Sequence, residues 1–84
     1  MLEKEVTLTN EVGLHARPAA VFAKAANGFA CDVAVIKEGT EANAKSMLSV
    51  LKLDVRKGDR VLLRTDGDGE QVALDELVSL IDSL

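Results

Sequence analysis

The chain contains no tryptophan and no tyrosine, and two phenylalanines are its only aromatic residues among 84. Proteins that bind single-stranded nucleic acid usually stack bases on aromatic side chains, and nucleic-acid binding in general needs a basic surface. The formal net charge is −4. We therefore do not expect nucleic acid as a partner, and we expect a core made of Leu, Val, Ile and Ala.

Cysteine, histidine and proline each occur once, as Cys31, His15 and Pro18. One cysteine cannot form an internal disulfide, which is typical of a protein in the reducing cytoplasm. No second histidine or cysteine stands at ligand spacing, so we expect neither a zinc site nor a hydrolase triad, and no cofactor. The chain also lacks a long apolar run, so neither a signal peptide nor insertion into a membrane is expected.

Periodicity in the sequence predicts seven elements in one domain of residues 1–84. The strands are predicted over residues 2–9, 32–37, 40–43 and 60–65, and the helices over residues 16–27, 47–53 and 70–84. The order β-α-β-β-α-β-α favours a two-layer α+β domain, in which helices cover one face of an antiparallel sheet.

The acidic loop at residues 66–70 has some features of a calcium loop. We reject that interpretation because Leu77 stands where a calcium loop has its bidentate glutamate. We predict instead that Asp68 is the N-cap of the last helix, with Gln71 reaching back to it as a capping box.

The single histidine stands at the predicted start of a helix. Gly13 allows the backbone to bend, and Pro18 suits the first helical turn, so His15 falls at the helix N-terminus. Unpaired N–H groups and the helix dipole make such a terminus a site for anions, phosphate in particular, and Arg17 adds a permanent cation. These positive charges also favour the neutral imidazole, which is the nucleophilic form.

A second surface feature lies on the short helix predicted after Ser46, which we expect to be its N-cap. Three residues of this helix fall largely outside its inward side: Met47, Leu48 and Leu51, which we call the apolar patch. Apolar side chains in this arrangement need either a core or a partner to cover them. Near His15, the outward pair Arg17 and Lys24 suggests a second contribution to docking.

The segment GLHARPA at residues 13–19 resembles the active-site signature of the HPr family, the histidine-containing phosphocarriers of the bacterial phosphoenolpyruvate:sugar phosphotransferase system. The segment AKSML at residues 44–48 is similar to the second signature of that family. The element order also fits, so the resemblance covers the whole chain. It implies an open-faced β-sandwich, with three helices on one face of a four-stranded antiparallel sheet.

The resemblance implies a cytoplasmic, monomeric phosphoryl carrier, which is not a standalone enzyme. It would accept a phosphoryl group from phospho-Enzyme I and pass it to the A domains of sugar-specific enzymes II. His15 would be the phosphoacceptor through Nδ1, Arg17 would stabilise the phosphoryl group, and an HPr kinase/phosphorylase would be a further partner if Ser46 is a regulatory phosphorylation site. Docking would use Ala16, Ala20, Lys24, Lys45, Met47, Leu48, Leu51 and Lys52.

Two alternatives remain open at this point. Leu53-Asp54 is similar to the nitrogen-related branch of the family, which would imply a regulatory role, whereas Lys45-Ser46 is similar to the sugar branch. The chain could also be a regulatory binding module that docks through the apolar patch without transferring phosphate. A sensor of small ligands is a weaker hypothesis, because no aromatic or glycine-rich pocket is visible.

Overall fold

The computed structural model describes all 84 residues and contains the seven predicted elements in the predicted order. None of its helices has both the length and the apolar character that crossing a membrane requires. The first strand ends two residues earlier than predicted. The elements are β1 (Leu2–Thr7), α1 (Ala16–Asn27), β2 (Asp32–Lys37), β3 (Thr40–Asn43), α2 (Met47–Lys52), β4 (Arg60–Asp66) and α3 (Glu70–Ser83).

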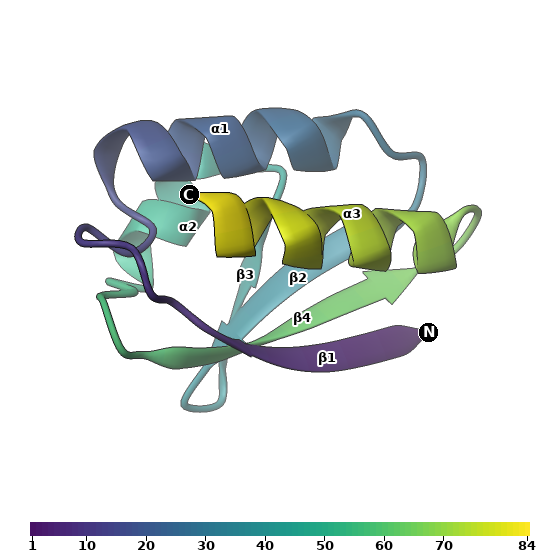
Figure 1. Cartoon of the computed structure of the whole chain (residues 1–84). Coiled ribbons are helices and arrows are strands. Elements are labelled where there is room, and N and C mark those ends of the chain that lie inside the picture. Colours follow the sequence, from purple (N-terminus) through teal and green to yellow (C-terminus); the bar gives the residue numbers. More distant parts are fainter.

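The four strands form one antiparallel sheet in the order β1-β4-β2-β3. Figure 1 shows α1 and α3 stacked above this sheet, with α2 at its β3 side. The last helix packs on β1 and β4, while α1 contacts both other helices. The open-faced arrangement that the sequence predicted is therefore confirmed.

Side-chain alternation along the strands explains which face of the sheet the helices cover. Val33 and Val35 of β2 are buried, as are alternate residues of β4, whereas the residues between them are partly exposed. The side of α1 that faces the sheet and the other helices carries the predicted stripe, and Phe22 in its middle is fully buried. Burial of this apolar surface is the main force that holds the two layers together.

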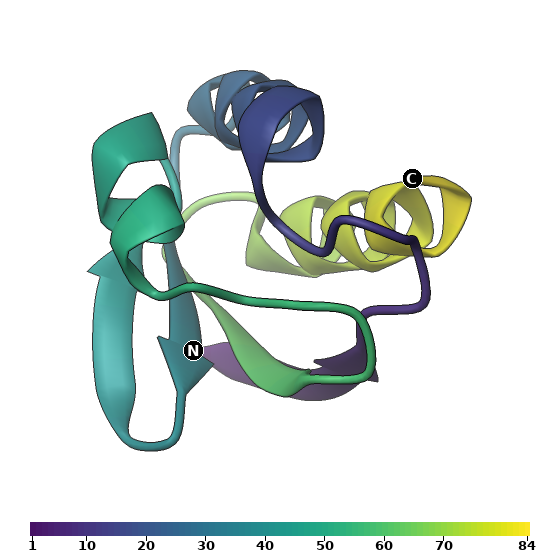
Figure 2. The ribbon, with the colours of Figure 1, turned by 90° about the vertical axis from the view of Figure 1, so that its left-hand side faces the viewer.

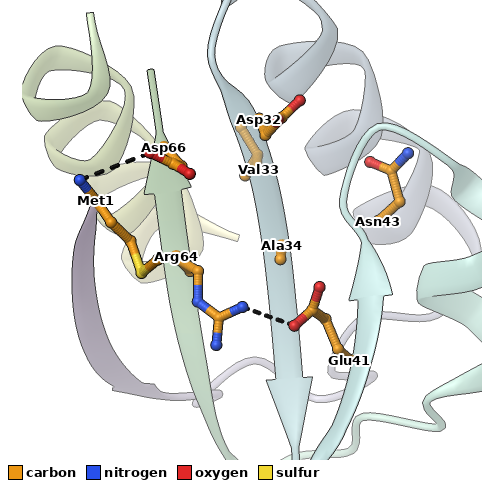
Figure 3. Close-up of a pocket in the computed structure, with 8 residues that line it drawn as sticks. All are labelled: Met1, Asp32, Val33, Ala34, Glu41, Asn43, Arg64 and Asp66. Atoms are coloured by element: carbon orange, nitrogen blue, oxygen red, sulfur yellow. Dashed lines mark hydrogen bonds and ion pairs between the residues drawn. The ribbon is translucent and has the colours of Figure 1, made fainter. Parts of the chain in front are cut away.

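The uncovered face of the sheet is held by ion pairs. Arg64 Nε lies 3.0 Å from Glu3, and its Nη1 lies 2.6 Å from Glu41. Figure 3 shows Arg64 and Glu41 in the shallow pocket of about 350 Å³ that this face contains, where Met1 also approaches Asp66. Glu3 and Glu41 neutralise the guanidinium group of Arg64. This pocket therefore offers no free cation to an anionic ligand.

The predicted capping box of the last helix is wrong. The N-cap of α3 is Gly69 in the left-handed region with φ of 75°, no side chain caps the helix, and Gln71 instead donates to Asp75 at 3.1 Å. The reason is that a glycine lies between Asp68 and the helix. Glycine adopts this left-handed backbone readily and so occupies the N-cap position. Buried Thr65 stabilises the start of α3 by donating to the Glu70 carbonyl at 2.9 Å.

Candidate functional site

His15 is the N-cap of α1, as predicted, with an extended backbone at φ −119° and ψ 160°. Its side chain makes no capping hydrogen bond, so the imidazole is free for other contacts and is 36% exposed. The following residue, Ala16, has φ of +50°, a left-handed conformation that is strained for any residue with a Cβ. The strained residue lies between His15 and the first regular turn of α1.

The loop that carries His15 is fixed to the segment after α2. Leu14 is fully buried, and its N–H donates to the Val55 carbonyl at 2.9 Å. Asn10 donates from its side chain to the Gly13 carbonyl at 2.9 Å, and Gly13 has φ of +61°. The hydrogen bond between Leu14 and Val55 holds two loops, about forty residues apart in the sequence, against each other, and the one from Asn10 fixes the first loop internally.

One ring nitrogen of His15 is engaged by a residue that the sequence analysis did not place in the site. His15 Nε2 lies 2.9 Å from Asp54 Oδ1. Since an ionised carboxylate can only accept a hydrogen bond, this contact favours the ring form with a proton on Nε2. In the neutral ring this leaves the lone pair on Nδ1. Asp54 also supplies a negative charge that the sequence-based argument for a neutral imidazole did not include.

Asp54 is itself held by Arg56. The Nη2 atom of Arg56 lies 2.9 Å from Asp54 Oδ2, and its Nε lies about equally far from both carboxylate oxygens. Hydrogen bonding from Arg56, with a smaller contribution from His15, holds the pKa of the Asp54 carboxyl below its ordinary value of 3.8. The group is therefore an anion at neutral pH.

Lys37 and Asp59 fix the loop on which Asp54 and Arg56 lie. Lys37 Nζ donates to the Asp54 carbonyl at 2.6 Å and lies 2.9 Å from Asp59 Oδ2. The same carboxylate accepts the Arg56 N–H at 2.8 Å. The hydrogen bond from the Arg56 backbone, followed by that from Lys37, lowers the pKa of Asp59.

Acid is therefore expected to loosen this loop. Because the pKa values of Asp54 and Asp59 are lower in the folded chain than in the unfolded one, their contribution to stability is full above the ordinary value of 3.8 and is lost as the pH falls through the folded values. Melting curves from neutral pH downward measure this. Asp59→Asn should lower the melting temperature at neutral pH and reduce its fall in acid; the same acid dependence in both proteins would contradict the assignment.

The remaining predicted active-site residue, Arg17, is exposed on the first turn of α1. None of the ion pairs in the structure involves it. Its guanidinium group is thus available to an anion that arrives near His15. No group of three or more His, Cys, Asp or Glu residues lies close enough together to hold a metal ion.

The predicted docking residues lie mostly on α1 and α2, which pack side by side (Figure 2). Ser46 is the N-cap of α2 as predicted, and its hydroxyl accepts the Ser49 N–H at 3.4 Å. In the apolar patch, Met47 is 41% and Leu48 71% exposed, whereas Leu51 is half-buried against the core. Two apolar side chains thus face solvent beside Ser46, the N-cap of α2.

The small and charged members of the predicted docking set differ in their availability. Lys24 and Lys52 are exposed, as is Ala16, and Ala20 is half-buried on the outer side of α1. Lys45 is different, because its Nζ donates to the Phe29 carbonyl at 2.8 Å. Its ammonium group therefore ties the β3–α2 connection to the end of α1.

The fold and the site together define a class of protein: a small α+β carrier domain that presents one histidine at an exposed helix N-terminus. An arginine without an ion-pair partner stands on the first turn of the same helix. A family model described as the PTS HPr component phosphorylation site matches residues 2–83. The chain belongs to the HPr family, the phosphocarriers of the phosphotransferase system, in which a phosphohistidine is formed.

Curated relatives match over nearly their whole length. The phosphocarrier protein HPr of Vibrio cholerae is 42% identical over 100% of this chain and 99% of its own. The HPr-like protein Crh of Halalkalibacterium halodurans is 38% identical over 98% of both chains. The family therefore includes carriers and Crh proteins at comparable similarity to this chain.

Solved structures agree on the fold. A crystal structure of HPr from Thermoanaerobacter tengcongensis is 41% identical, with a TM-score of 0.97 over 99% of this chain and 93% of that one. Crh of Bacillus subtilis, described as an intertwined dimer with a swapped domain, is 38% identical, with a TM-score of 0.80 over 99% of this chain and 95% of that one. The expectation of a monomer is thus at odds with the dimers that occur among these relatives.

Proposed function

We propose that this chain accepts a phosphoryl group on His15 Nδ1 from phospho-Enzyme I and donates it to the A domain of an enzyme II. The observation that carries the proposal is the state of the ring: Nε2 contacts Asp54, which leaves Nδ1 as the nucleophilic nitrogen at an exposed helix N-terminus. Arg17 stands on the first turn of that helix without an ion-pair partner.

The transfer itself needs positioning and charge stabilisation rather than covalent help from the protein. The Nδ1 lone pair forms a bond to phosphorus while the bond to the donor breaks, and the donor atom keeps that bonding pair. Charge on the phosphoryl oxygens meets the N–H groups at the start of α1 and the Arg17 guanidinium group. Donation to the next protein reverses these steps, so the carrier returns unchanged.

Partner docking is proposed for the exposed residues around the site. The apolar patch and the exposed Lys24 and Lys52 lie on the helix pair that also carries His15 and Ser46. Such a surface combines an apolar centre with cations, which suits partners that present apolar and acidic side chains. The proposal implies a cytoplasmic protein, because its partners in the phosphotransferase system act there.

The test is an incubation of the chain with Enzyme I and phosphoenolpyruvate, followed by intact mass measurement. We expect one phosphoryl group to be added per chain, and we expect it to be removed when an enzyme II A domain is supplied. A parallel incubation with the nitrogen-related form of Enzyme I compares the two branches of the family. No added mass with either donor would contradict the proposal.

A second candidate function is a regulatory binding module, and the similarity to Crh proteins favours it. In this case the apolar patch binds a partner, and modification of Ser46 controls that binding. The discriminating result is a partner complex that survives His15→Ala with unchanged affinity.

Ser46→Asp is expected to slow phosphorylation of His15 while keeping thermal stability. A negative charge at the start of α2 is favourable for the helix. The same charge lies beside the apolar patch and should repel an acidic surface on Enzyme I, which lowers the transfer rate roughly three- to tenfold at low salt. The measurement is the initial transfer rate at low and high ionic strength, since salt screens the repulsion.

Ser46→Ala provides the control for this experiment, because it removes the cap without adding charge. It should lower the melting temperature slightly and leave the transfer rate close to that of the unmodified chain. An unchanged rate for Ser46→Asp at low salt would remove Ser46 from the docking surface.

A further inference from the structure

We propose that Asp54 is a positioning residue for the phosphoryl transfer, which selects the tautomer and fixes the orientation of the His15 ring. This inference rests on the proposed function and deepens it. The phosphoryl group is accepted by Nδ1, and Asp54 acts only through the opposite nitrogen of the same ring, Nε2, at 2.9 Å.

The backbone of Asp54, a half-buried residue, is held by its neighbours in a strained conformation. Its φ of +53° lies in the left-handed region, where a residue with a Cβ is strained. The N–H donates to the Leu51 carbonyl at 3.1 Å, and the carbonyl accepts from Lys37 Nζ at 2.6 Å. A glycine would adopt this conformation without strain. The aspartate therefore adds only its carboxylate, and that carboxylate faces His15.

Selection of one tautomer matters because a neutral imidazole places its proton on either nitrogen. With the proton on Nδ1 the accepting nitrogen has no lone pair and cannot attack phosphorus. The Asp54 carboxylate accepts only from Nε2–H and so favours the reactive tautomer. When the Nδ1–P bond forms and Nε2 keeps its proton, the ring becomes positively charged, and the carboxylate already lies next to that charge.

Arg56 determines which end of the Asp54 side chain faces His15. Oδ2 has two contacts with Arg56, from Nη2 at 2.9 Å and from Nε at 3.1 Å, whereas Oδ1 contacts His15 at 2.9 Å and Arg56 Nε only at 3.2 Å. Arginine can only donate hydrogen bonds. In an Asp54→Asn variant the amide oxygen is therefore expected to face Arg56, and the NH₂ group to face His15. That NH₂ donates to Nε2, which moves the ring proton to Nδ1 and blocks the nucleophile.

This geometry predicts that Asp54→Asn lowers the transfer rate more than Asp54→Gly does. Asp54→Asn should lower the initial transfer rate at least about tenfold, since a catalytic histidine held in the wrong tautomer loses most of its activity. Asp54→Gly should cost less, roughly two- to fivefold, because the reactive tautomer remains accessible but is no longer selected. A role limited to the contact with Arg56 predicts the reverse, since asparagine keeps a polar group of nearly the same size beside Arg56 and glycine keeps none.

The direct readout is the pair of ring ¹⁵N chemical shifts of His15 in the unphosphorylated chain, followed upward in pH until they no longer change. In the unmodified chain Nε2 should be the protonated nitrogen; in Asp54→Asn it should be Nδ1; in Asp54→Gly the two forms should mix. Asp68→Asn is the matched control for the change in charge, because Asp68 is exposed and forms no ion pair in the loop before α3.

The same tautomer in all three proteins would overturn the proposal, as would transfer rates of both variants equal to that of the unmodified chain. A failure of the unmodified chain to accept phosphate would instead overturn the proposed function. The ¹⁵N shifts distinguish these results, because they need neither Enzyme I nor phosphoenolpyruvate.

Discussion

His15→Ala is expected to abolish phosphoryl acceptance and to leave the fold intact. The only nitrogen that the proposed reaction uses is removed, so no phosphoryl group should be added by Enzyme I and phosphoenolpyruvate. The imidazole is partly exposed, makes no capping hydrogen bond and contacts the half-buried Asp54. Its loss opens no cavity in the core, so the melting temperature should change by only a few degrees.

The matched control for this variant is Ser46→Ala, which keeps His15 and removes the other candidate phosphorylation site. It should accept one phosphoryl group as the unmodified chain does. Phosphate on the His15→Ala protein, delivered by Enzyme I, would show that His15 is not the acceptor.

Gly13→Ala is expected to give the largest loss of stability, and to disturb the site as well. A Cβ at this position would lie 2.7 Å from the Cα of Arg56 and closer still to the Val55 carbonyl oxygen. The φ of +61° adds strain for any residue other than glycine. Because the obstacle is backbone, the two loops must separate, and we expect a loss of about 3 kcal/mol or more in the free energy of unfolding.

Gly39→Ala is the control that separates the two contributions. Gly39 also has a positive φ, of +81°, but nothing lies within 4 Å of an added Cβ. This variant should therefore lose only about 1–2 kcal/mol, from backbone strain alone. Urea unfolding measures both values. Equal losses in the two variants would show that the loops at Gly13 and Val55 are not closely packed.

Local patterns in the sequence were sufficient to predict the elements and the two-layer α+β class, whereas the open-faced β-sandwich was implied by the resemblance to the HPr family. Alternating residues around Val33 and Val61, and the stripe that contains Phe22, define which side of each element is buried, and burial decides the packing. Pro18 and Gly13 placed His15 at the start of α1 for a similar local reason. The predicted cap at Ser46 is also confirmed, since it depends on one neighbouring turn.

The contact between His15 and Asp54 could not be predicted in this way. It joins two loops through hydrogen bonds such as Leu14 N–H to the Val55 carbonyl, and no periodicity of the sequence encodes such pairs. In the sequence, Leu53-Asp54 indicates only a similarity to one branch of the family. The wrong prediction of Asp68 as an N-cap has a similar origin. The turn before α3 depends on the left-handed backbone of Gly69, which is the N-cap instead.

The most direct test of the account is the identification of the atom that carries phosphate after incubation with Enzyme I and phosphoenolpyruvate. Correlation of ³¹P with ring ¹⁵N in the phosphorylated chain reports it without substitution of any residue. The account predicts a phosphorus–nitrogen bond to Nδ1 of His15, with Nε2 still facing Asp54. Phosphate on Nε2, or on Ser46, would contradict it.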